Sequence, residues 1–207
     1  MGTRTQVLPA ADPQSLTTAR DVLRRSGLVA FPTDTVYGLG VLVNDPSGIE
    51  SLYRVKGRES AKAIPVLLCD LSELPLVAAE ITPGLQRLAQ HFWPGPLTLV
   101  VPRHPALPRE LSPYPTIGVR IPDHPVALAL LRLAGPMAVT SANLSGRSSP
   151  TTAQEVVDQL DGRIELVLDG GRTPGGISST VVDYSGLEPV ILRQGPIDLG
   201  ELLMVLG

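Results

Sequence analysis

The chain has 207 residues, of which 43% are hydrophobic and 18% charged, and this suits one domain with a full apolar core. Its formal net charge of −3 argues against a broad basic surface for phosphate-driven nucleic-acid binding. A single cysteine, Cys69, excludes an internal disulfide. No apolar run approaches the ~20 residues of a membrane span, and the N-terminus lacks the apolar core of a signal peptide. We therefore expect a cytoplasmic protein.

Helices and strands are predicted in a mixed order. Residues 12–27 read as a first helix that ends at Gly27, followed by strands at 28–32 and 39–44 and a helix at 45–57 with Asp45 as its cap. Further helices are predicted at 82–93, 124–135, 151–162 and 198–206, and further strands at 63–69, 97–102, 116–122, 137–143, 164–171, 179–184 and 190–195. Because several strands follow one another directly, the pattern predicts an α/β fold with a mixed, twisted sheet rather than a doubly wound one.

Four polar segments flank these strands and are candidate binding segments. The segment 32–40, "PTDTVYGLG", crowds threonines and Asp34 at a strand end, where α/β proteins place ligands; a plain turn with Asp34 bonded to its own backbone is an equal alternative. The segment 138–150, "AVTSANLSGRSSP", offers hydroxyls, an amide and backbone N–H groups that suit phosphate, or it is a simple connector. The glycines of 169–180, "DGGRTPGGISST", do not form a P-loop, so a plain loop is expected there, or a cover for a ligand.

The fourth segment, "YRVKGRESAKAIP" at 53–65, holds both lysines of the chain, Lys56 and Lys62. The other 15 basic residues are arginines, so ordinary surface charge in this chain is carried by arginine. A retained lysine then favours a task that needs a compact ammonium, such as holding a phosphate. The alternative is a solvated basic loop beside a helix C-terminus.

Other catalytic patterns are not found in the sequence. The histidines His91, His104 and His124 follow no metal-ligand spacing, and neither a G-x-S-x-G elbow nor a G-x-G-x-x-G loop after a strand occurs. Trp93 is predicted to be a packed core aromatic residue, since no second aromatic residue is expected to form a base-stacking surface with it.

Seven short motifs in order resemble the YrdC-like family, the threonylcarbamoyl-AMP synthases. They are "PTDTVYGLG", "KGR", "FWPGPLTLV", "TIGVRIPDHP", "TSANLSG", "STVVD" and "ILRQGPI". The resemblance implies a single YrdC-like domain over residues 10–200 without a second domain, built as a twisted mixed sheet with flanking helices around a concave basic cavity. It also implies a reaction in which L-threonine, bicarbonate and ATP give threonylcarbamoyl-AMP, pyrophosphate and water. A transferase complex would then modify tRNA.

The family's Lys-x-Arg and Ser-x-Asn signature corresponds here to Lys56, Arg58, Ser141 and Asn143. By resemblance, Lys56 and Arg58 are the catalytic cations that meet phosphate or carbamate oxygens. The implied threonine contacts are Thr35, Arg120, Thr140, Ser141 and Ser179. The implied nucleotide contacts are Lys56, Arg58, Lys62, Thr116, Ser141, Asn143 and Arg193. Arg120 also has a chemical rationale, because a guanidinium binds a carboxylate through two parallel hydrogen bonds.

The sequence departs from the family at two places and leaves alternatives open. Leu67 stands where some relatives place a histidine contact. In the strand that follows the second lysine, the proline is shifted to position 65, as Pro65. Mg²⁺ is expected with ATP, although no acidic cage for it is evident in the sequence. The alternatives are a paralogue of the same fold without threonine-dependent adenylation, a module that binds RNA (weak tRNA binding included), and a structural adaptor.

Overall fold

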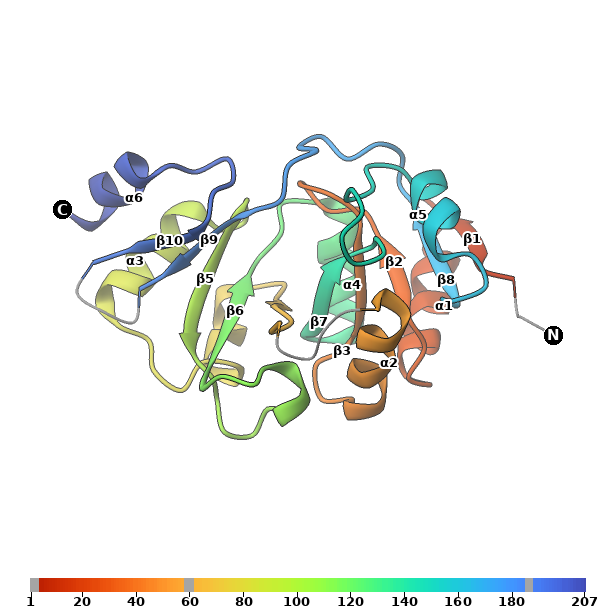
Figure 1. Ribbon diagram of the computed structural model, residues 1–207, viewed down its shortest axis with the longest axis horizontal. Helices are drawn as coiled ribbons and strands as arrows, with labels where there is room; N and C mark the ends of the chain where they lie inside the picture. The colour runs from red at the N-terminus through yellow and green to blue at the C-terminus, as the bar shows by residue number, and fades with distance from the viewer. Residues whose placement is uncertain (1–3, 58–61, 185–187) are drawn as a thin grey trace.

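The computed structural model describes residues 4–57, 62–184 and 188–207 of the chain, and it consists of one large mixed sheet with helices around it (Figure 1). The strands are β1 (Gln6–Pro9), β2 (Val29–Phe31), β3 (Gly38–Leu42), β4 (Val66–Leu67), β5 (Leu97–Pro102), β6 (Thr116–Arg120), β7 (Met137–Ser141), β8 (Leu166–Asp169), β9 (Thr180–Asp183) and β10 (Val190–Arg193). The helices are α1 (Pro13–Leu23), α2 (Pro46–Lys56), α3 (Pro83–Phe92), α4 (Pro125–Ala134), α5 (Ala153–Leu160) and α6 (Leu199–Leu206), with 3₁₀ turns at Leu71–Leu76 and Arg109–Leu111.

The sheet order over the described residues is β1-β8-β2-β3-β7-β4-β6-β5-β9-β10. The sheet contains both parallel pairs, such as β2 with β8 and β5 with β9, and antiparallel pairs, such as β3 with β7 and β5 with β6. The predicted mixed α/β sheet is therefore confirmed. Strand β4 has two residues and pairs with β7 on one side and with β6 on the other, so the two halves of the sheet meet at a narrow neck.

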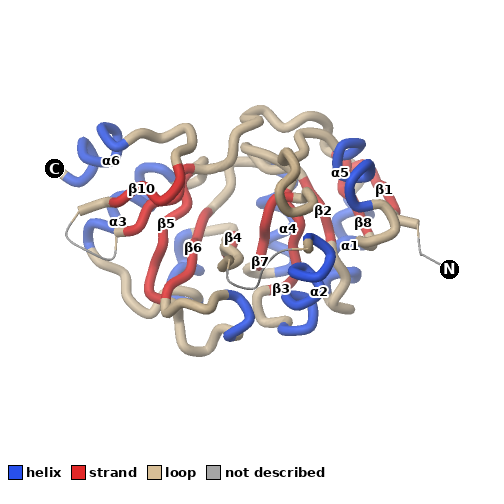
Figure 2. Tube along the Cα trace, viewed as in Figure 1, coloured by secondary structure: helices blue, strands red, loops and turns tan. Residues whose placement is uncertain are grey.

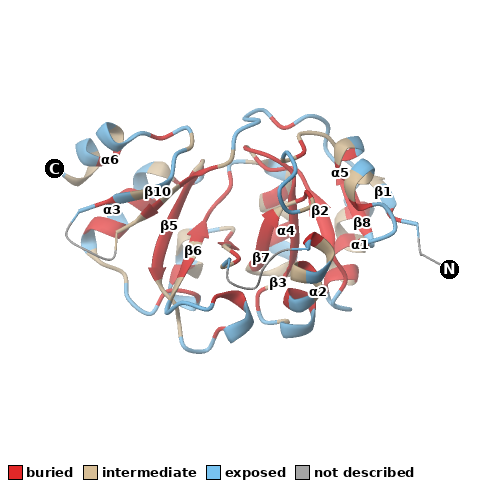
Figure 3. Ribbon diagram, in the orientation of Figure 1, coloured by how far each residue is buried: buried red, intermediate tan, exposed pale blue. Residues whose placement is uncertain are grey.

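The helices divide between the two halves of the sheet, as Figures 1 and 2 show: α1, α2, α4 and α5 surround the half that contains β2, β3, β7 and β8, whereas α3 and α6 lie at the other end. One apolar cluster joins α1 and α4 to β2, β7 and β8 through residues such as Leu23, Leu130 and Phe31. A larger cluster includes Leu39, Leu52 and Leu99 and extends across both halves. Figure 3 shows the central strands buried and β10 exposed at the edge of the sheet.

The ends of α2 follow the local chemistry expected of the sequence, whereas α1 ends at Leu23 with Arg24 as its C-cap, before the predicted Gly27. Asp45 accepts a hydrogen bond from the Gly48 N–H at the start of α2, and Gly57 ends that helix in the left-handed conformation, which glycine adopts without steric cost. At the start of α5, Thr152 is the cap and its side chain accepts from the Glu155 N–H, while the Glu155 carboxylate accepts from the Thr151 N–H.

Two strands differ from the prediction. The strand predicted at 63–69 is reduced to the two residues of β4, and β1 was not predicted. β1 is a mostly exposed edge strand, so it shows no alternation or apolar run that sequence inspection could detect. Within the described residues, no helix is long and apolar enough to cross a membrane.

Candidate functional site

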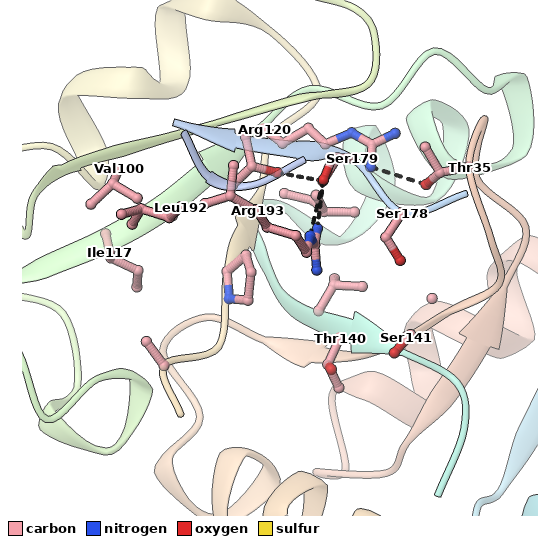
Figure 4. Close-up of a pocket in the computed structure, with 18 of the residues that line it drawn as sticks. Thr35, Val100, Ile117, Arg120, Thr140, Ser141, Ser178, Ser179, Leu192 and Arg193 are labelled. Carbon is pink, nitrogen blue, oxygen red and sulfur yellow. Dashed lines mark hydrogen bonds between the residues drawn. The ribbon is translucent and has the colours of Figure 1, made fainter. Parts of the chain in front are cut away.

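A cavity of about 730 Å³ lies where the two halves of the sheet meet, and Figure 4 shows the residues around it. It is lined by the β2–β3 loop, β4, β5, β6, the end of β7, the segment before β9, and β10. Eight of the residues predicted for the site line it together: Thr35, Lys62, Thr116, Arg120, Thr140, Ser141, Ser179 and Arg193. Segments far apart in the sequence thus converge on one site.

Arg120, at the end of β6, is buried and held in one orientation. Its Nε donates to the Gly95 carbonyl at 2.9 Å, its Nη1 donates to Thr35 Oγ1 at 3.0 Å, and its Nη2 forms an ion pair with Asp34. Burial lowers the pKa of Arg120 and the neighbouring Asp34 opposes that shift, but a guanidinium remains charged in a protein. Among described residues, these bonds use three of its five N–H groups. Two donors thus remain for a ligand.

Asp34 distinguishes the two interpretations of the 32–40 segment. The turn interpretation gave its carboxylate to its own backbone, whereas the structure pairs it with Arg120, 86 positions away. His124 lies close enough to Asp34 for the carboxylate to raise its pKa, although burial dominates and lowers that pKa overall. The cluster forms only because the fold brings together residues that lie far apart in the sequence.

Ser179 is oriented by two neighbours on the opposite half of the cavity. Its hydroxyl lies 2.8 Å from the Thr98 hydroxyl, and Arg193 Nη2 donates to its Oγ at 3.0 Å and to its carbonyl at 2.8 Å. These bonds are drawn in Figure 4 together with the Arg120–Thr35 bond. Hydroxyl and guanidinium donors therefore face the cavity from both sides.

The cavity also has an apolar wall, which Figure 4 places beside the polar groups. Val100, Ile117, Val181 and Leu192 contribute to it, and Leu192 is 59% exposed. Polar groups at one end and an apolar wall at the other suit a ligand with an anionic part and a ring. Leu67 also lines the cavity, at the position where some relatives carry a histidine, and it brings no polar contact there.

Lys56 and Asn143 do not line the cavity. Both are buried, at 3% and 7% exposure, and they lie behind the segment that contains Ser141. Lys56 Nζ donates to the carbonyl oxygens of Ser141 and Asn143, the latter at 2.7 Å. The fourth signature residue, Arg58, lies outside the described residues.

The described lining residues do not by themselves fit a resident metal ion. They supply hydroxyls, amide groups and cations, but no carboxylate, whereas a hard cation such as Mg²⁺ prefers carboxylate and other oxygen ligands. No cluster of three His, Cys, Asp or Glu side chains that could hold a metal occurs among the described residues.

The segment 170–179 between β8 and β9 crosses from one half of the sheet to the other and brings Ser178 and Ser179 to the cavity. The buried Tyr37 hydroxyl anchors its start, because it donates to the Gly171 carbonyl at 2.7 Å and accepts from the Gly170 N–H at 3.2 Å. Further along, the Gly176 N–H donates to the Thr35 carbonyl at 2.8 Å. The segment is thus a strap fixed to the β2–β3 loop.

This chain resembles known proteins in its sequence and in its fold. The model of the Sua5/YciO/YrdC family, described as telomere recombination, matches residues 21–195. Threonylcarbamoyl-AMP synthase of Pyrococcus abyssi is 41% identical over 191 residues, which cover 91% of this chain and 56% of that protein. The protein of the same name from Bacillus subtilis is 43% identical over 206 residues, which cover 98% of this chain and 59% of that protein.

Among solved structures, P. abyssi Sua5 complexed with L-threonine superposes with a TM-score of 0.90 at 40% identity, over 93% of this chain and 57% of that one. The chain therefore spans a little more than half the length of these relatives. The family match covers most of the chain, and the solved relative shares its fold. The chain accordingly belongs to the Sua5/YciO/YrdC family.

Proposed function

We propose that the chain is an L-threonylcarbamoyladenylate synthase, which converts L-threonine, bicarbonate and ATP to threonylcarbamoyl-AMP, pyrophosphate and water. The observation that carries the proposal is the convergence of eight predicted threonine and nucleotide contacts on one cavity. A relative of the same fold and 40% identity has been solved with L-threonine, and relatives above 40% identity bear the name of this activity.

In this proposal, the threonine carboxylate binds the two N–H groups that Arg120 retains, because a guanidinium fork matches a carboxylate. The Thr35 hydroxyl is already fixed by Arg120 and by Thr33, whose Oγ1 lies 3.0 Å away. Ser179 and Thr140 complete the amino-acid site. Fixed groups of this kind cost little reorganisation when the substrate binds.

The chemistry has two steps. The threonine amine attacks bicarbonate with loss of water, or CO₂ with loss of a proton, to form a carbamate. A carbamate oxygen then attacks the α-phosphorus of ATP and expels pyrophosphate. Both steps place negative charge on oxygen atoms, which Lys62, Arg120 and Arg193 can stabilise from the cavity wall without a covalent intermediate. The resemblance adds Lys56 and Arg58 to these cations. Mg²⁺ would enter as part of the MgATP substrate.

The test is threonine-dependent pyrophosphate release from MgATP and bicarbonate, with the adenylate product identified by mass spectrometry. The matched variants are Arg120→Lys, which removes the planar fork, and Arg54→Lys, an exposed position on α2. Loss of a charge-assisted hydrogen bond costs about 1.5–3 kcal/mol, so we expect kcat/KM for threonine to fall about 10- to 100-fold in Arg120→Lys. Arg54→Lys should match the wild type. Release that does not depend on threonine would overturn the proposal and favour the paralogue.

We further propose that the product passes to a tRNA-modifying transferase complex in the cytoplasm. The net charge of −3 favours transfer through a protein partner over tight direct tRNA binding. Incubation of the purified protein with labelled tRNA at increasing salt tests this: we expect only weak, salt-sensitive binding. Tight binding at physiological salt would contradict this route and support the RNA-binding alternative.

A further inference from the structure

The side chain of Lys56 is turned away from the cavity and into the protein. Lys56 is the last residue of α2, and its ammonium has acceptors in one segment, residues 141–147: the carbonyls of Ser141 and Asn143 and, at 3.4 Å, the Asn143 side-chain oxygen. Its own carbonyl accepts from the Ser145 N–H at 2.9 Å. Lys56 therefore holds this segment through both its side chain and its backbone.

The acceptors suit the chemistry of the side chain. A lysine ammonium has three N–H donors and no acceptor, and oxygen atoms of the 141–147 segment surround it. Asn143 completes the arrangement from the other side, because its Nδ2 donates to the carbonyls of Leu144 at 2.8 Å and Arg147 at 2.7 Å. Lys56 and Asn143 thus both take part in the internal bonding of the segment.

What the segment presents to the cavity is different. Thr140 and Ser141 line it, whereas Lys56 and Asn143 do not, and Lys62 lines it from the neighbouring loop. The carbonyl of Ser141 binds Lys56 on one side while the Ser141 residue faces the cavity on the other. Lys56 can therefore affect the shape of the site through the position of Ser141.

We propose that Lys56 is a positioning residue, whose buried ammonium holds the 141–147 segment so that Ser141 faces the ligand, and that it does not contact the ligand itself. This differs from the role in phosphate or carbamate binding that the resemblance assigns to Lys56. It rests on the proposed function only for the identity of the ligand. It also explains the use of lysine: three converging oxygen atoms suit a compact ammonium, whereas the flat fork of arginine suits paired oxygens of one plane.

The first test uses the fact that Lys56 and Lys62 are the two lysines of the chain. In protein labelled with ¹³C- and ¹⁵N-lysine, the side-chain resonances of the two residues are followed by NMR during MgATP addition, with Lys62→Arg for assignment. We expect Lys62 to shift strongly and Lys56 to shift much less. A Lys56 shift as large as that of Lys62 would overturn the proposal.

The second test needs no ligand, so it is independent of the proposed function. Amide hydrogen exchange of Ala142, Leu144, Ser145 and Arg147, whose N–H groups are bonded in the structure, is compared between the wild type and Lys56→Met. We expect exchange there to accelerate at least tenfold, with strands β2 and β8 unchanged. The contrast variants Lys62→Met and Arg54→Met should leave these amides at their wild-type rates.

Together, the two tests distinguish failure of the positioning role from failure of the proposed function. Wild-type exchange rates in Lys56→Met would overturn the positioning role even if the enzyme is active. If MgATP shifts neither lysine, the proposed function is in doubt while the exchange result still decides the role of Lys56. Should Lys56→Met fail to fold, Lys56→Arg keeps the charge but not the geometry, and accelerated exchange at the same four amides is expected there too.

Discussion

Tyr37 is the individual residue with the clearest pH-dependent contribution to stability. Its side chain is fully buried, and its hydroxyl bonds both Gly170 and Gly171 at the start of the strap. Burial raises the pKa of Tyr37 from its usual value of 10.0 to about 12, because the charged phenolate would lose its hydration. A raised pKa contributes stability that is complete below pH 10 and is lost as the pH rises towards 12.

Tyr37→Phe therefore has a pH-dependent effect on the free energy of unfolding. At pH 8 the variant should be less stable by about 1–3 kcal/mol, because it loses two hydrogen bonds to the strap that contribute about 0.5–1.5 kcal/mol each. Between pH 10 and 12 the wild type should lose about 2 kcal/mol that the variant does not lose, so the gap closes. Urea unfolding at each pH measures the gap. A gap that stays constant up to pH 12 would contradict the role of the buried phenol.

Single site residues could be predicted from the sequence only where a motif carried them. Arg120 and Ser179 were found through the resemblance and do line the cavity, whereas the role of Asp34 was missed. Its partner is 86 positions away, and local sequence cannot distinguish an aspartate that bonds its own turn from one that pairs with a distant arginine. The scarcity of lysine singled out Lys56 for holding a phosphate, but composition cannot tell which way its ammonium points, and the structure directs it to the carbonyls of Ser141 and Asn143.

At the level of elements, the strap depends on close contact between two backbones. A Cβ built on Gly175 would lie 2.5 Å from the Asp34 carbonyl oxygen and 3.1 Å from Thr35 Cα. Only glycine fits such an approach, since a backbone cannot move aside as a side chain can. The strap and the β2–β3 loop therefore have to shift together if this glycine is replaced.

Gly175→Ala should thus displace Thr35 and, under the proposed function, weaken threonine binding. We expect at least a tenfold rise in the dissociation constant for threonine, equivalent to about 1.4 kcal/mol, with secondary structure intact. Gly200→Ala, in the first turn of α6 where the added Cβ would lie 3.2 Å from an Asp198 oxygen, is the matched control and should bind threonine normally. Calorimetric titration measures both, and wild-type affinity in Gly175→Ala would refute the close-contact argument.

Elements with strong local signals were the ones predicted well. The helices with a capping residue and a following proline, such as α2 and α3, begin where the sequence indicates. β4 is shorter than its apolar run implies, because only Val66 and Leu67 find partners on neighbouring strands. The length of a strand in a sheet depends on the neighbouring strands with which it pairs, and its own sequence does not specify them.

For the molecule as a whole, the cavity is a consequence of the narrow neck at β4. The half of the sheet with β3 and β7 supplies Thr140 and Ser141, and the half with β5, β6 and β9 supplies Arg120 and Ser179. A ligand that uses all four residues contacts both halves at once. Occupancy of the site should then stabilise the protein across the neck rather than on one side.

Under the proposed function, this leads to a prediction for the protein with L-threonine and MgATP. At about 100 times the dissociation constant, a ligand that binds only the folded state stabilises it by about 2.7 kcal/mol. For a chain of this length that corresponds to a rise in Tm of about 5–10 °C. Calorimetry measures the rise, with D-threonine as the control because its carboxylate and hydroxyl cannot occupy the same positions together.

Amide hydrogen exchange then shows where the stabilisation occurs. If the ligand joins the two halves, amides of β7 and of β9 should both be protected when L-threonine and MgATP are present, because opening either half would release the ligand. Protection confined to β5, β6 and β9 would contradict a bridging ligand, and it would mean that Thr140 and Ser141 line the cavity without holding what binds there.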